Sequence, residues 1–143
     1  MPNYPQQKIK IPVPKKYSPS ERMIIAEALV EHIRERTERG YDKTGVKKFE
    51  PLDPDYKERK LAMGGKGFCD LTLTGDMLIS MDVLNWKKNG EVEIGFEKNS
   101  DENAKADGHV SGKATGKVRD FLGIAPTRVQ QIIRELRAIG DIR

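Results

Sequence analysis

The sequence has few residues that build metal sites or disulfides, and it has no long apolar run. Cys69 is its single cysteine, which excludes an internal disulfide framework and a zinc site made of several cysteines. Two histidines leave little for a histidine metal site. No apolar run approaches the roughly 18 residues of a membrane span, and residues 1–16 lack the apolar stretch of a signal peptide. We therefore expect a cytosolic protein that has no metal, no cofactor and no membrane contact.

Apolar content is modest and charge is abundant. Leu, Ile, Val and Phe make up 33 of the 143 residues, just above the level of about 20% below which chains are usually disordered. Charged residues make up 34%, against about 25% in an ordinary domain. The length suits one domain. A small core is therefore expected, beneath a surface of solvated charge or of contacts with partners.

The net charge of +4 is unevenly distributed along the chain. Residues 1–17 carry +4, residues 18–108 carry −4 and residues 109–143 carry +4. Two basic ends around an acidic middle suit contact with nucleic acid or with acidic protein surfaces, and also head-to-tail packing of copies in a ring. A solvated surface without a partner is the alternative.

Residues 1–17 are predicted to be an extended basic arm, separate from a single domain over residues 18–143. Four prolines in this segment block a regular helix. Charged and apolar residues alternate over residues 8–11, which suits a strand added to the edge of another sheet. The arm is expected to lie on a neighbouring protein or to be a disordered tail. Its predicted partner-binding residues are Lys8, Ile9, Lys10, Ile11 and Val13.

Helix signals recur after the arm. Ser18 and Glu21 form a capping-box pattern that predicts a helix over about 19–39, ending at Gly40. Arginines alternate with glutamates in its second half, which favours a solvated, ion-paired face over a phosphate site. Further helices are expected over about 53–62, 74–81, 101–107 and 126–139, with Gly108 ending the fourth of the five.

The clearest strand signal is a β-hairpin over residues 82–97. Asn89-Gly90 suits the positive φ angles of a tight turn, and Val92, Ile94 and Phe96 share one face of the second strand. The expected fold class is α+β. A long N-terminal helix and a C-terminal helix pack on a small antiparallel sheet that contains this hairpin, and an extended N-terminal arm precedes them.

Patterns of catalytic residues are weak. Cys69 has no Cys or His motif beside it and is interpreted as a small buried apolar residue. The glycines of residues 64–67 lack the spacing of a phosphate loop and predict a hinge. We therefore expect no enzyme. The alternative hypothesis is a small DNA-binding regulator with a helix-turn-helix-like segment over 118–140, in which Arg128, Gln131 and Arg134 contact the nucleic acid.

Six short segments, taken in order, resemble one family. They are IRERT (33–37), Asp42-x-x-Gly45, FEPL (49–52), LTGDML (73–78), VEIG (92–95) and RDFLGI (119–124), the last before the closing helix. In this order the chain is similar to the virion-morphogenesis and tail-completion proteins of tailed bacteriophages. The likeness extends from about residue 21 to residue 139.

This resemblance implies a structural role without catalysis. Such proteins form rings in the neck that joins the phage head to the tail. The implied partners are copies of the chain, portal or connector proteins and tail proteins, while DNA only passes through the channel. The implied location is the virion, after assembly in the host cytoplasm.

Overall fold

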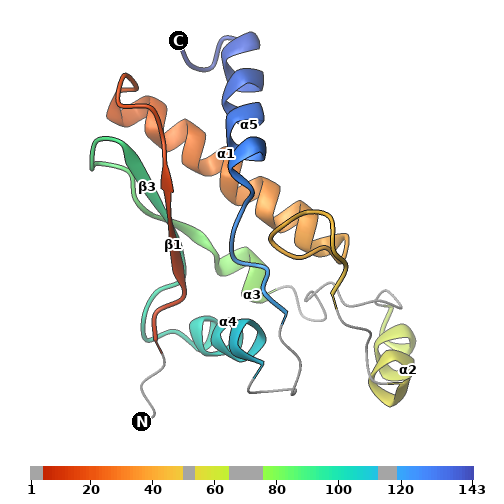
Figure 1. The fold of residues 1–143 in the computed structure, drawn as a ribbon. Helices are drawn as coiled ribbons and strands as arrows, with labels where there is room; N and C mark the ends of the chain where they lie inside the picture. The colour runs from red at the N-terminus through yellow and green to blue at the C-terminus, as the bar shows by residue number, and fades with distance from the viewer. Residues whose placement is uncertain (1–4, 50–53, 65–75, 113–118) are drawn as a thin grey trace.

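The computed structural model describes residues 5–49, 54–64, 76–112 and 119–143 of the chain. Five helices and a three-stranded antiparallel sheet lie within these ranges, which confirms the predicted α+β class (Figure 1). In chain order the elements are β1 (Lys8–Pro12), α1 (Pro19–Glu38), α2 (Pro54–Ala62), α3 (Asp76–Ser80), β2 (Asp82–Asn85), β3 (Glu91–Gly95), α4 (Asp101–Ser111) and α5 (Pro126–Ala138).

The helix ends follow local chemistry. Ser18 accepts a hydrogen bond from the Glu21 amide and the Glu21 carboxylate accepts one from the Ser18 amide, so the predicted capping box starts α1. The predicted end of α4 at Gly108 is wrong. That helix continues to Ser111 because Gly112, with a φ of 77°, supplies the left-handed residue that ends it.

The sheet has the strand order β1-β3-β2. Ile9 pairs with Ile94 and Ile11 with Val92, so apolar side chains share its inner face. On the outer face the Lys8 ammonium lies 3.0 Å from the Glu93 carboxylate. The alternation of charged and apolar residues in β1 therefore matches the alternation in β3.

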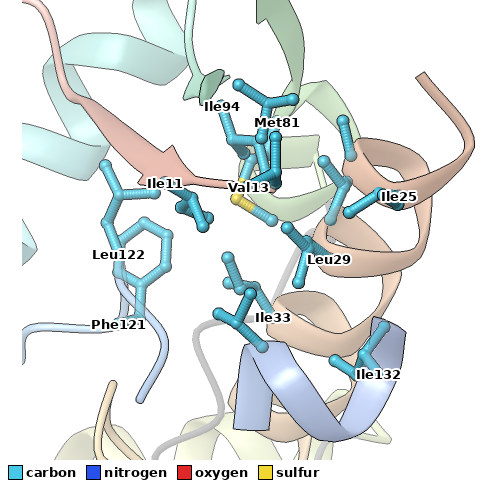
Figure 2. Packing of buried hydrophobic residues seen from close by; sticks show 14 of the residues in the cluster. Ile11, Val13, Ile25, Leu29, Ile33, Met81, Ile94, Phe121, Leu122 and Ile132 are labelled. Carbon is cyan, nitrogen blue, oxygen red and sulfur yellow. The ribbon is translucent and has the colours of Figure 1, made fainter. Parts of the chain in front are cut away.

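The core lies between this inner face and α1, and α5 packs against α1 (Figure 2). Ile25, Leu29 and Ile33 on α1 are fully buried. Phe121 lies in the segment before α5, and its ring packs edge-on against the ring of Phe96, with ring centres 6.1 Å apart. A single core therefore joins the sheet, α1, α5 and the segment before α5.

The prediction of an arm that projects from the body is wrong over residues 5–17. In the structure β1 pairs with β3 of the same chain, and Ile11, Val13 and Tyr17 are buried in the chain's own core. Alternation did indicate strand addition, but the chain's own sheet supplies the edge. Ile9 is half-buried and the side chains of Lys8 and Lys10 remain exposed.

Two residues that are distant from β1 in sequence, Gly95 and Asn103, explain how closely the N-terminal segment packs on the rest of the chain. A Cβ atom on Gly95 would lie 2.3 Å from the Gln7 carbonyl oxygen, so only glycine lets the two backbones approach there. Asn103 of α4 is fully buried, and its Oδ1 atom accepts a hydrogen bond from the Gln7 amide at 2.7 Å. Its Nδ2 group donates to the Pro5 carbonyl at 3.1 Å.

The hairpin is confirmed, but its first strand ends at Asn85 rather than at Lys88. Arg22 of α1 donates hydrogen bonds to the carbonyl oxygens of Trp86 and Lys87, at 2.8 and 2.9 Å. These carbonyls therefore accept hydrogen bonds from the Arg22 guanidinium rather than from a neighbouring strand. Gly90 has the positive φ expected of the turn, at 87°.

Arginines of α1 bind backbone carbonyls in two further places. Arg34 donates to the carbonyl oxygens of Leu78, Ile79 and Met81 at the end of α3. Arg36 donates to those of Lys43, Phe121 and Gly123. The predicted ion-paired face is thus wrong for Arg36, whereas Arg34 keeps the predicted ion pair with Glu31, at 3.8 Å, beside its carbonyl contacts. We call Arg22, Arg34 and Arg36 the carbonyl-binding arginines.

Of the two carbonyl-binding arginines in the C-terminal half of α1, Arg36 is buried, whereas the side chain of Arg34 is partly exposed. Arg36 is 5% exposed, and its contacts to Gly123 and Lys43 measure 2.6 and 3.3 Å. Burial lowers the pKa of the guanidinium to about 10, against the opposing effect of Asp42 and Asp120, so it stays charged at neutral pH. Arg36 therefore holds the loop after α1 and the segment before α5 on the same helix.

We predict that Arg36→Met lowers the free energy of unfolding by about 3 kcal/mol, because three carbonyls lose their charged donor. Urea unfolding at pH 7 measures this loss. Arg39→Met is the matched control: Arg39 is exposed, 3.7 Å from Glu35, and its loss should cost about 0.5 kcal/mol or less. Equal effects of the two substitutions would contradict the structural role of Arg36.

Candidate partner-binding groove

A groove of about 880 Å³ lies between β1 and α5. Residues 9–14 form one wall, and α5 forms the other through Val129, Ile133 and their neighbours. Residues 122–126 lie between these walls and run beside β1 (Figure 1). Both predicted basic ends of the chain therefore meet at one surface feature.

Charge in this groove is of one sign. Its lining includes Lys10, Lys43, Arg134 and Arg137, and no aspartate or glutamate. Lys43 forms an ion pair with Asp120 at 2.8 Å, and Arg137 donates to the Tyr17 hydroxyl at 2.5 Å. Within the described ranges, Lys10 and Arg134 form no ion pair. These two exposed cations can therefore meet an acidic partner without first giving up a salt bridge.

The segment between the walls is held by close contacts to the loop after α1. The Lys43 amide donates to the Asp120 carbonyl at 2.9 Å. A Cβ atom on Gly123 would lie 3.0 Å from the Lys43 side chain, which explains a glycine at this position. Together with the Arg36 contacts, these bonds keep residues 120–123 beside β1 and set the width of the groove.

A second hollow, of about 480 Å³, adjoins the start of α5 and is more polar. His32, Arg36, Arg39 and Arg128 line it. Burial, followed by the charges of the three arginines, lowers the pKa of His32 to about 4. This histidine is therefore neutral near pH 7.

The residues predicted to contact nucleic acid are divided between these two features. Arg128 and Gln131 line the polar hollow, where the Arg128 guanidinium donates to the Gln131 amide oxygen at 2.7 Å. Arg134 lines the groove instead. Residues 119–125 contain no helix, so this part of the segment over 118–140 lacks the first helix that a helix-turn-helix needs, and that prediction is wrong over this range. DNA contact by the three side chains stays a prediction.

Other predicted features yield no further site. Among the described residues, no group of three His, Cys, Asp or Glu side chains could hold a metal ion. No helix in the same ranges is long and apolar enough to cross a membrane. Cys69 and most of the predicted glycine hinge, residues 65–67, lie outside the described residues.

Comparison with known proteins adds no relative: no family model, no curated protein and no solved structure matches the chain.

Sequence reasoning named part of each wall of the groove. Four of the residues predicted to bind a partner line it, namely Ile9, Lys10, Ile11 and Val13, whereas Lys8 does not. Arg134 was named only for the alternative of DNA contact. Arg137 and Lys43 carried no signal, because their place depends on contacts between distant segments. The clustering of positive charge at both chain ends was the one indication that α5 and β1 share a role.

The two histidines predict a pH dependence of stability. Burial, with the charge of Arg119 as the lesser cause, also lowers the pKa of His109 to about 4. Since the unfolded value is near 6.5, the unfolded chain binds more protons between pH 6.5 and pH 4, so stability falls as the pH is lowered through this window. We expect each histidine to contribute about 1 kcal/mol to the loss between pH 7 and pH 5.5.

Urea unfolding of the wild type, His32→Gln and His109→Gln at both pH values measures these contributions. Each substitution should reduce the loss of stability between pH 7 and pH 5.5. An unchanged pH dependence in both variants would show that neither histidine is held neutral by the fold.

Proposed function

We propose that the chain is a structural subunit of the neck of a tailed bacteriophage, which joins the head to the tail by binding neighbouring proteins in a ring. Its task is positioning and contact rather than catalysis. The proposal starts from the ordered resemblance to tail-completion proteins and is supported by how the resembling segments meet in the structure.

The observation that carries the proposal is the convergence of three of these segments on Arg36. Arg36 belongs to the segment over 33–37, and it donates to the Lys43 carbonyl within the segment over 42–45. It also donates to the Phe121 and Gly123 carbonyls within the segment over 119–124. Segments that resemble one family in the same order thus form one packed unit, which chance likeness would not require.

The groove and its charge are compatible with a subunit that works through neighbours. Basic groups from both chain ends gather at the groove, whereas acidic residues such as Asp101 and Glu102 start α4. In Figure 1, α4 lies near the N-terminal end of β1, whereas the C-terminus of the chain lies toward the other end of β1. Opposite charges at separate places on one subunit suit a heterologous contact, the kind that closes rings.

In vitro complementation tests the proposal. The gene is expected in a tailed phage or prophage, and an amber mutation in it should yield filled heads and separate tails. Adding the purified protein to that lysate should join them and restore infectivity, as measured by plaque titre and electron microscopy. Arg36→Met should complement poorly, and Arg39→Met should complement like the wild type.

Two results would contradict the proposal. One is a gene outside any phage or prophage, or intact particles formed without the protein. The other is a mutant lysate that lacks virion proteins and is not rescued by added protein, because a DNA-binding regulator would act on synthesis rather than on joining.

A further inference from the structure

We propose that the groove binds an extended, acidic segment of a partner protein, which pairs with the free edge of β1 as a fourth strand. This inference rests on the geometry of β1, α5 and the groove, and it stands whether or not the chain is a neck protein.

The backbone of β1 leaves one edge open. The Phe96 amide donates to the Gln7 carbonyl at 3.0 Å, and the Val13 amide donates to the Gly90 carbonyl at 2.9 Å. Hydrogen-bonded and non-hydrogen-bonded pairs alternate in an antiparallel ladder, so the odd-numbered residues of β1 face β3. Lys8 and Lys10 therefore direct their N–H and C=O groups to the other edge, along which the groove runs.

The strand already paired with β1 indicates what its free edge would accept. Along β3, Glu93 lies opposite Lys10 and forms the ion pair with Lys8, while Val92 and Ile94 lie opposite Ile11 and Ile9. Side-chain alternation belongs to the strand and is the same at both of its edges. A second strand of alternating acidic and apolar residues would thus find lysines on one face and apolar side chains on the other.

The α5 wall of the groove also favours an acidic strand. Arg134 lies exposed on α5 and lines the groove opposite β1, while Ile124 and Val129 supply apolar contacts between them. An acidic strand in the groove would have cations on both sides. Its apolar side chains would pack on Ile9 and Ile124, which the monomer leaves partly exposed, as in other cases of strand addition.

Other occupants fit less well. Pairing of two β1 edges would place lysines against lysines, and like charges opposite each other destabilise a sheet. A nucleic acid would meet the arginine and the lysines, but also the isoleucines, valines and prolines that make up most of the lining. The observations therefore favour an acidic peptide.

The test uses the full-length protein, labelled with ¹⁵N, and a defined peptide. The probe is the acetylated and amidated heptapeptide Glu-Val-Glu-Ile-Gly-Phe-Glu, which has the sequence of residues 91–97. Binding should shift the amide signals of Lys8, Lys10 and Arg134 and protect the two lysine amides from exchange. The existing protection of Ile9 and Ile11 should persist, which separates edge addition from displacement of β3. A peptide with lysine in place of each glutamate should not bind.

Protein variants test the charges and the space separately. Lys10→Glu combined with Arg134→Glu should weaken peptide binding by about tenfold. Lys57→Glu combined with Lys105→Glu changes the net charge equally on α2 and α4, outside the groove, and should bind like the wild type. Gln130→Trp, at an exposed position of the lining, should obstruct the groove and abolish binding. An amide spectrum like that of the wild type shows that each variant is folded.

Several results would overturn the proposal. They are no shifts at millimolar peptide, equal binding of the lysine peptide, equal weakening by the control pair, or loss of the β1–β3 protection on binding. Binding of a single-stranded oligonucleotide at the same signals, in competition with the peptide, would assign the groove to nucleic acid instead. Failure here leaves the neck proposal untouched, because complementation of heads and tails is scored independently.

Discussion

Backbone carbonyls in irregular segments need hydrogen-bond donors when they point into a protein, and α1 supplies these donors as arginine side chains. Arg22 serves the hairpin loop, Arg34 the end of α3, and Arg36 both the loop after α1 and the segment before α5. A buried carbonyl without a partner costs about 1–3 kcal/mol, so these bonds largely decide where the segments lie. One helix thus organises most of the chain without long strands or a large core.

Arg36 matters most because it acts on the groove. Its bonds to Gly123 and Phe121 hold the segment that separates α5 from β1, and its bond to Lys43 brings the loop after α1 against that segment. β1 and α5, which carry the basic groups of the two chain ends, are more than 100 residues apart in sequence. They become neighbours through this arrangement, together with the pairing of β1 with β3.

Local signals predicted the elements well. The Ser18 capping box, the Asn89-Gly90 turn and the apolar spacing of α5 depend on residues a few positions apart, and each is present. The partners of Arg36 lie up to 87 residues away, and a carbonyl group leaves no trace in the sequence. An arginine among glutamates therefore indicated an ion-paired surface, although tertiary contacts give it a different role.

One residue in the sequence did indicate where β1 lies. Gly95 lies within the hairpin predicted over residues 82–97, and a glycine in a strand indicates close approach of another backbone. Buried Asn103 could not have been recognised from the sequence, because asparagine is usually exposed and its partners lie at the opposite end of the chain. The groove itself follows from such distant contacts, so only its basic residues could be anticipated.

Amide hydrogen exchange along β1 tests the central claim most directly, namely that this strand belongs to the chain's own sheet and keeps one edge open. The account predicts alternation in the free protein: slow exchange at Ile9 and Ile11, which face β3, and fast exchange at Lys8 and Lys10, which face the groove. Fast exchange at all four amides would show that β1 is not paired with β3. Slow exchange at all four would show that the edge is already covered, and either result would contradict the account.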